Sequence, residues 1–157
     1  MNRASLQSTP VEDRWFVGTL VRVVAGAAET GGALMVMEQR ARRGFSPPRH
    51  VHRNEDTALW VRSGRITVEV GDRTQVVEEG GFVWLPRAVP HTFRVDSDEV
   101  DLVELASPGG IEGFHLDASD PAPAPDLPPP GEPDIPRLLA SAGPYDVEIV
   151  GPPLAAG

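Results

Sequence analysis

Short runs of alternating apolar and polar residues dominate the chain between positions 15 and 106. In the clearest run, Ile66, Val68 and Val70 alternate with Thr67 and Glu69, which is the period-two pattern of a half-buried β-strand. Glycine, proline, asparagine and aspartate separate the runs and mark turns. The segments that we expect to form strands are 15–24, 33–40, a segment that opens at 50, 58–62, 66–70, 75–78, 82–85, 91–95 and 100–106.

Eight or nine short strands with this spacing predict an all-β sandwich or barrel. No segment between positions 15 and 106 has a convincing 3.6-residue apolar period, which disfavours a βαβ architecture. The length of 157 residues fits a single core. We expect a barrel over residues 1–116 and an extension over 117–157.

The extension is rich in proline. Between positions 121 and 136 every second or third residue is proline, so this stretch cannot donate ladder hydrogen bonds and favours an extended path. Asp134 could cap a short helix, and the alternation over 145–149 could add a strand. The extension is either a disordered linker or a strap that crosses the barrel and docks its apolar end, and we prefer the strap.

The composition of the chain excludes several kinds of partner and of chemical site. Asp and Glu outnumber Lys and Arg by 23 to 14, for a formal charge of −9, and such a surface repels nucleic-acid phosphates and anionic lipids. The absence of cysteine excludes disulfides, thiolate metal sites and a cysteine nucleophile. No run approaches the ~18 apolar residues of a membrane helix, and residues 1–11 lack the apolar run of a signal peptide. We therefore expect a cytoplasmic protein whose partner is neither nucleic acid nor membrane.

Three of the four histidines lie in two short segments of the predicted barrel. His50 and His52 are two residues apart, so on a strand both imidazoles point to one face and can reach one metal ion. An exposed polar pair on an edge strand gives the same spacing. His91 begins a later strand, and His115 stands apart, where we expect a surface or packing role.

Glycines flank the histidine pair at characteristic distances. Gly44 lies six residues before His50, and Gly64 lies twelve residues after His52. This segment resembles the first cupin motif, G-x5-H-x-H-x3–4-E-x6-G. Counting from either end places the glutamate of the motif at Thr57, so the usual carboxylate is missing.

A second segment carries Gly80, Pro86, Ala88, His91 and Val95. It resembles the second cupin motif, G-x5-P-x-G-x2-H-x3-N, with alanine in place of glycine and valine in place of asparagine. The resemblance covers about residues 15–116 and, weakly, the tail. It is strongest to small bacterial cupins, especially the quercetin dioxygenase-like group.

The resemblance implies a cupin jelly-roll β-barrel, or double-stranded β-helix, with a Pro-rich C-terminal strap and a short C-terminal helix. It also implies that His91 lies beside His50 and His52, and that the three hold iron, nickel, manganese, copper, cobalt or zinc. Imidazole suits several of these metals, so the ligand type does not select one. Small cupins commonly form homodimers, and residues 15–24 are the candidate interface.

The missing carboxylate leaves the role of Thr57 open. Thr57 either holds a metal-bound water or a substrate oxygen, or it is an ordinary β-branched strand residue that fills space. Its neighbours Glu55 and Asp56 should point to the opposite face and do not easily substitute, although a local bulge could bring Asp56 inward.

Three functions fit this altered motif. The first is a three-histidine metal site that leaves positions open for a substrate and for dioxygen or water, as in a quercetinase-like dioxygenase. The second is metal-independent chemistry, by an isomerase, cyclase or lyase of small-molecule biosynthesis in which one histidine transfers protons. The third is a barrel that only binds a ligand.

Apolar residues that share strand faces with the motif residues predict a pocket. Leu59 continues the face of Thr57, and Phe93 continues the face of His91. An apolar cavity with a few imidazoles suits a small aromatic, enolic or polyketide-like molecule better than a charged sugar. The candidate pocket residues, each of which could equally belong to the core, are Met35, Met37, Leu59 and Phe93.

Overall fold

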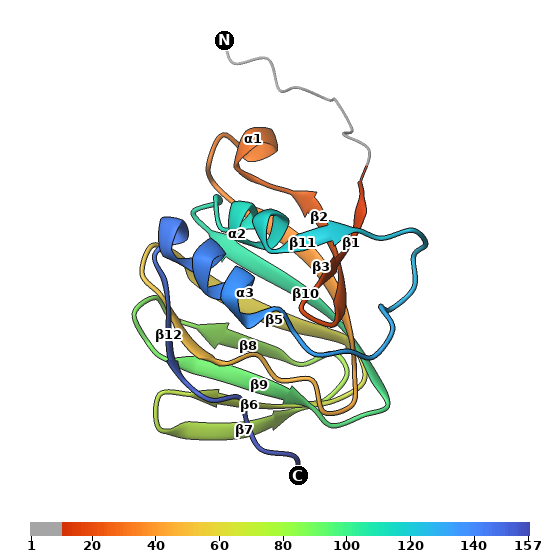
Figure 1. The fold of residues 1–157 in the computed structure, drawn as a ribbon. Helices are drawn as coiled ribbons and strands as arrows, with labels where there is room; N and C mark the ends of the chain where they lie inside the picture. The colour runs from red at the N-terminus through yellow and green to blue at the C-terminus, as the bar shows by residue number, and fades with distance from the viewer. Residues whose placement is uncertain (1–10) are drawn as a thin grey trace.

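Two antiparallel β-sheets face each other in a computed structural model that describes residues 11–157 (Figure 1). The expectation that residues 1–11 carry no signal peptide therefore lies almost wholly outside the described residues. The seven-stranded sheet has the order β11 (Ser119–Pro121), β1 (Asp13–Phe16), β2 (Thr19–Ala25), β3 (Met35–Arg42), β10 (Glu99–Ser107), β5 (Asp56–Ser63) and β8 (Phe82–Leu85). The five-stranded sheet has the order β12 (Val147–Gly151), β4 (Arg49–His52), β9 (His91–Val95), β6 (Ile66–Val70) and β7 (Arg73–Val77).

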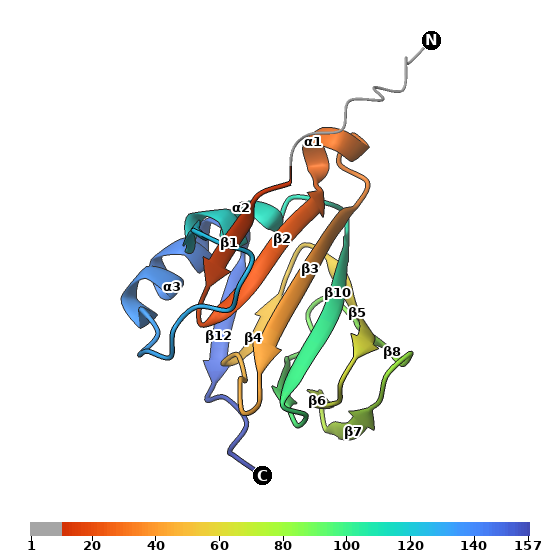
Figure 2. The same ribbon diagram turned by 90° about the vertical axis from the view of Figure 1, so that its right-hand side faces the viewer.

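The alternating pattern predicted most of these strands, and the jelly-roll expectation is confirmed (Figure 2). The expected strand over 15–24 is wrong in one respect, because it is a hairpin. Val17 and Gly18 have φ angles of 48° and 81°, and this left-handed pair turns the chain so that β2 pairs back on β1. This turn is difficult to predict from the sequence, because valine rarely adopts a positive φ.

Two motif positions show why glycine is favoured at turns of this barrel. Gly64 has φ 90°, and a Cβ there would lie 2.5 Å from the carbonyl oxygen of Glu99. Ala88, which replaces the glycine of the second motif, also lies in the left-handed region, at φ 63°. The alanine therefore accepts a backbone strain that glycine would avoid.

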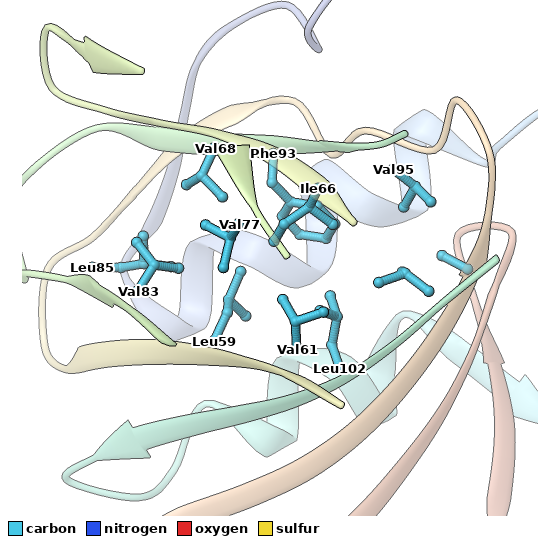
Figure 3. Close-up of a cluster of buried hydrophobic side chains, with 12 residues drawn as sticks. Leu59, Val61, Ile66, Val68, Val77, Val83, Leu85, Phe93, Val95 and Leu102 are labelled. Carbon is cyan, nitrogen blue, oxygen red and sulfur yellow. The ribbon is translucent and has the colours of Figure 1, made fainter. Parts of the chain in front are cut away.

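The space between the sheets is filled by two hydrophobic clusters. The larger one joins side chains of β5, β6, β9 and β10 that point toward one another (Figure 3). It includes Leu59, Val61, Ile66, Phe93 and Leu102. The second cluster lies against the helices and includes Phe16, Met35, Met37, Phe114 and Leu138. The inward faces of the strands thus supply most of the core, and helices α2 and α3 complete the second cluster.

Helices cover one side of the barrel. They are α1 (Ala27–Thr30), α2 (Glu112–Asp117), α3 (Ile135–Ala142) and the 3-10 turn η1 (Gly143–Tyr145). The predicted cap of α3 is confirmed, because the Asp134 side chain accepts a hydrogen bond from the backbone N–H of Arg137 at 3.0 Å. None of the helices in residues 11–157 is long and apolar enough to cross a membrane.

The proline-rich segment is a strap that packs on the barrel, as one of the two alternatives for the extension expected. The indole N–H of Trp15 donates to the carbonyl oxygen of Asp126 at 2.8 Å, and Arg42 donates to the carbonyl oxygen of Pro128 at 2.7 Å. Beyond α3, β12 lies beside β4 (Figure 2). Their pairing places Val147 opposite His52 and Ile149 opposite His50. The tail therefore contributes an edge strand to the sheet that carries two of the motif histidines.

Candidate metal centre and cavity

Three histidines meet between the two sheets. His50 and His52 lie on β4 with the two-residue spacing that sends both rings to one face, and His91 pairs with His50 across β4 and β9. The ring centroids are 4.5 Å apart for His50 and His91, 5.0 Å for His50 and His52, and 5.2 Å for His52 and His91. One ring nitrogen from each lies within 4.8 Å of the other two. The two motif segments thus converge at one point.

A hydrogen bond orients each imidazole. Nδ1 of His50 lies 2.6 Å from the Pro48 carbonyl oxygen, Nδ1 of His52 lies 2.6 Å from Oε1 of Glu55, and Nδ1 of His91 lies 3.1 Å from the Val89 carbonyl oxygen. Because carbonyl and carboxylate oxygens accept, each Nδ1 carries the proton. The lone pair is then on Nε2 in all three rings, which is the form that binds a metal.

Burial lowers the pKa of two of these rings, His50 and His91. Desolvation, followed by the neighbouring charges of His91 and His52, lowers the pKa of His50 well below its ordinary value. Desolvation, followed by the charge of His52, lowers the pKa of His91 to about 4. Because a metal competes with protons for the imidazole nitrogen, these low pKa values favour metal binding at neutral pH.

An apolar cavity of about 70 Å³ opens on the three histidines. It lies where the two hydrophobic clusters meet, because its lining draws on both. By this measure one water needs roughly 10–15 Å³, so the cavity holds about five waters. Its lining includes the predicted pocket residues Leu59 and Phe93.

The other two predicted pocket residues lie elsewhere. Met35 and Met37 are fully buried in the second hydrophobic cluster and are not part of the cavity lining. Their strand, β3, is the central strand of its sheet, between β2 and β10. Their side chains fill the space beneath α2 and α3 instead of facing the histidines.

Thr57 is also outside the cavity lining. Its side chain is 1 % exposed, and its hydroxyl is the one buried side-chain oxygen or nitrogen in residues 11–157 without a hydrogen-bond partner. Thr57 pairs with Leu85 on β8 and with Ala106 on β10. Its surroundings are therefore mostly apolar.

The two acidic residues before Thr57 point in different directions, so the expectation that both lie on the opposite face is wrong for Glu55. Asp56 accepts hydrogen bonds from the backbone N–H and the guanidinium of Arg87 at 2.9 and 3.0 Å, so the alternative in which a bulge brings Asp56 inward is wrong. Glu55 is 4 % exposed and accepts the Nδ1 proton of His52. The Glu55 carboxylate thus orients the His52 ring through its Nδ1 atom.

Two further titratable residues line the cavity, and the motifs do not include them. His115 on α2 is buried against Phe16 and Phe114, and its Nδ1 lies 3.2 Å from the carbonyl oxygen of Ile111. Of the expected surface or packing role, the surface alternative is wrong and the packing alternative agrees with the structure, because the residue is 5 % exposed. Desolvation, followed by the charge of His52, lowers its pKa to about 4.

Glu104, the second of these residues, lies in the middle of β10. Its even-numbered neighbours Val100, Leu102 and Ala106 are all buried, so the period-two pattern places Glu104 inward with them. A carboxylate in an otherwise apolar strand face was the signal that could have identified this residue from the sequence.

Comparisons with known proteins agree with this geometry. Residues 37–107 match the family described as Cupin domain. Quercetin 2,3-dioxygenase from Bacillus subtilis (strain 168) is 26 % identical over 110 residues, which is 69 % of this chain and 33 % of that protein. The chain therefore corresponds to about a third of the length of this curated relative.

Solved structures share the fold at low sequence identity. An RmlC-like cupin from Shewanella frigidimarina has a TM-score of 0.56 at 20 % identity, covering 71 % of this chain and 95 % of that one. KdgF from Halomonas sp. has a TM-score of 0.55 at 21 % identity, over 60 % and 83 %. Bacillus subtilis oxalate decarboxylase, which has Mn(II) centres, has a TM-score of 0.57 at 16 % identity, over 70 % and 30 %. With both motif segments folded into one barrel, the family match over residues 37–107 and these likenesses support a cupin superfamily member.

Proposed function

We propose that this cupin is a metal-dependent enzyme in which His50, His52 and His91 hold one divalent transition metal. The observation that carries the proposal is the shared orientation of the three rings, each with Nδ1 bonded to an oxygen and Nε2 free. When bound, the metal supplies Lewis-acid chemistry, a template for an oxygen-bearing substrate and, for a redox-active ion, a means of engaging dioxygen.

The nitrogen donors indicate a transition metal but do not select one of the six that imidazole commonly binds. Imidazole binds iron, nickel, manganese, copper, cobalt and zinc, and no thiolate is available in a chain without cysteine. Three neutral ligands leave the full charge of the ion to attract an anionic oxygen of the substrate. An enolic or phenolic substrate meets this requirement.

The cavity supports a small substrate. Its apolar walls exclude water and orient a flat ring or chain against the histidines. The likeness to a quercetin 2,3-dioxygenase supports an oxidoreductase that acts on a small aromatic, enolic or polyketide-like molecule. A volume of about 70 Å³ favours substrates smaller than a flavonol.

Metal analysis tests this function. We expect protein purified without chelator to contain about one equivalent of a transition metal, or to take one up from iron, nickel, manganese, cobalt or zinc salts. His91→Ala should lose this metal. The proposal is wrong if the wild-type protein stays metal-free after each addition.

A second candidate rests on Glu104 and His115, which place an acid and a base in the same cavity. These groups favour a metal-independent isomerase, cyclase or lyase of small-molecule biosynthesis. Turnover that survives EDTA would support this candidate, and turnover restored only by metal would exclude it. A third possibility, a barrel that only binds a ligand, predicts a copurifying molecule that remains unchanged.

Two further expectations concern the whole protein. We propose that it acts in the cytoplasm and that it forms a homodimer with residues 15–24 in the interface. The indole of Trp15 already donates to Asp126 of the strap, so the strap would contribute to such an interface. Light scattering at micromolar concentration would contradict the dimer if the mass were that of one chain.

A further inference from the structure

We propose that Glu104 accepts a proton from the substrate in this cavity, and that the substrate is a small neutral molecule with an acidic O–H, such as an enol or a phenol. The inference rests on the proposed function, because it requires that a substrate occupies the cavity. It assigns the proton transfer to a residue outside both histidine motifs.

The position of Glu104 carries the inference. Glu104 lies opposite Met37 on β3 and Leu59 on β5 and shares the cavity lining with the three histidines. It is not one of the residues whose ligating atoms gather within 4.8 Å. A molecule that contacts the histidines from the cavity therefore lies within the same small space as this carboxyl.

The carboxyl of Glu104 has no hydrogen-bond or ion-pair partner within residues 11–157, unlike its acidic neighbours on β10. Glu99 binds Arg40 at 3.0 Å, and Asp101 binds Arg62 at 2.7 Å. Glu55, which is 4 % exposed, accepts from His52. An unpartnered acidic group in an apolar cavity is costly for the fold and is typical of functional sites.

Electrostatics fit this assignment. Desolvation raises the pKa of Glu104, the charge of His52 opposes this shift and the charge of Glu55 adds to it. A raised pKa makes the carboxylate a stronger base than an exposed glutamate. The described cavity lining contains no arginine or lysine, so no side-chain cation is present to bind a substrate that arrives as an anion.

The step is a simple proton transfer. The substrate O–H bond breaks, its electron pair stays on the substrate oxygen, and the proton forms a new O–H bond with the Glu104 carboxylate. The carboxyl becomes neutral and the substrate becomes an anion, so charge is conserved. No oxidant or reductant is needed for this step.

Proton counting tests the assignment. Catechol, a neutral phenol near pH 7, is titrated calorimetrically into zinc-loaded protein in two buffers of different ionisation enthalpy. Zinc is chosen because it has no redox chemistry. The matched variants are Glu104→Gln and Glu99→Gln, since Glu99 is an exposed glutamate of the same strand. Zinc content is measured on every sample.

In wild-type protein and in Glu99→Gln we expect binding without net proton release, because Glu104 takes up the proton. In Glu104→Gln we expect about one proton released to the buffer per catechol bound and about tenfold weaker binding, with unchanged zinc content. Glu104→Leu replaces the glutamine variant if that variant fails to fold.

Three results would overturn the inference. A large fall in the zinc affinity of Glu104→Gln would make Glu104 a metal ligand instead of a base. Equal proton release and equal affinity in wild type and Glu104→Gln would make it a bystander. Zinc-loaded wild-type protein that binds no catechol would exclude a phenolic substrate, whereas failure to load zinc would instead count against the proposed metal site.

Discussion

At the scale of single residues, the buried polar side chains differ in whether they have a partner. Glu55 bonds His52, and Thr92 donates to the carbonyl oxygen of Pro47 at 2.7 Å. Thr57 and Glu104 are also inward-facing, yet neither side chain has a hydrogen-bond partner among residues 11–157. The paired side chains stabilise the fold, whereas the unpaired ones lower its stability.

Replacement of Thr57 should therefore stabilise the protein. Thr57→Val keeps the shape and removes an unpaired buried hydroxyl, so we expect the free energy of unfolding to rise by about 1 kcal/mol in urea denaturation. Thr92→Val is the matched control, because Thr92 is also 1 % exposed but is bonded, and it should lose about 1–3 kcal/mol. A destabilised Thr57→Val would point to a partner for the hydroxyl in solution.

Removal of the charge behind His52 should weaken metal binding. Glu55→Gln can still accept the Nδ1 proton but removes the negative charge beside this metal ligand, so we expect metal affinity to fall about tenfold in chelator competition. Glu148→Gln serves as control, because Glu148 pairs with Arg53 on the exposed side of β12. Equal losses in the two variants would show a general effect of charge.

The buried imidazole of His115 should make stability depend on pH. Its pKa falls from 6.5 in the unfolded chain to about 4 in the fold, so above pH 6.5 both states are neutral and stability is at its maximum. As pH falls through this window only the unfolded chain takes up the proton, and stability drops by up to about 3 kcal/mol.

Urea denaturation of metal-free protein at about pH 7 and about pH 5 measures this loss. His115→Gln should reduce the difference between the two pH values without abolishing it, because the pKa of His50 and the pKa of His91 are shifted in the same direction. An unchanged difference would show that His115 is accessible to protons in the fold.

Sequence patterns predicted the site residues unevenly. The three histidines followed from a two-residue spacing and a motif, because both are local properties of a strand. The bond between Glu55 and His52 did not follow, since the strand β5 begins at Asp56 and Glu55 lies before the alternation that was used to place it. The position of His115 depends on how α2 packs against the barrel, which no local pattern records. The alternation over 100–106 indicates that Glu104 points inward, but it does not show which cavity Glu104 lines.

At the scale of elements, strands were easier to predict than their ends. Period-two alternation located β5, β6, β8, β9 and β10 within a few residues. It missed the turn at Val17. It could not show that β12 pairs with β4, because that pairing joins a barrel strand to a segment of the extension far away in the sequence. The tail is thus a structural part of the sheet that holds the site.

The apolar face of α3 should matter to stability. Leu138 is 4 % exposed and lines the cavity, whereas Leu139 is 51 % exposed. We expect Leu138→Ala to lower the free energy of unfolding by about 2–5 kcal/mol and Leu139→Ala to change it by less than about 0.5 kcal/mol. Similar losses in the two variants would mean that α3 packs differently from the structure described above.

At the scale of the whole molecule, the cavity joins parts of the chain that are far apart in sequence. Strand β4 brings two histidines, β9 the third, β10 the glutamate and α2 the fourth histidine. Anything that binds at their meeting point connects both sheets. A bound metal should therefore stabilise the entire fold.

Thermal unfolding tests this coupling. At a free metal concentration of about 100 times its Kd, binding adds about 2.7 kcal/mol, which corresponds to a rise in Tm of about 5–10 °C for a domain of this size. EDTA should reverse the rise, and His91→Ala should show none. A metal that leaves the wild-type Tm unchanged either binds elsewhere or binds the unfolded chain equally well.

The pairing of β12 with β4 has a consequence for biosynthesis. The ribosome makes His50 and His52 well before Val147 and Ile149, which lie opposite them in the finished sheet. Until those later residues emerge, the histidine strand has one open edge and the cavity lacks part of its wall. The last described strand thus closes the cavity late, and we expect tight metal binding only after β12 has paired with β4.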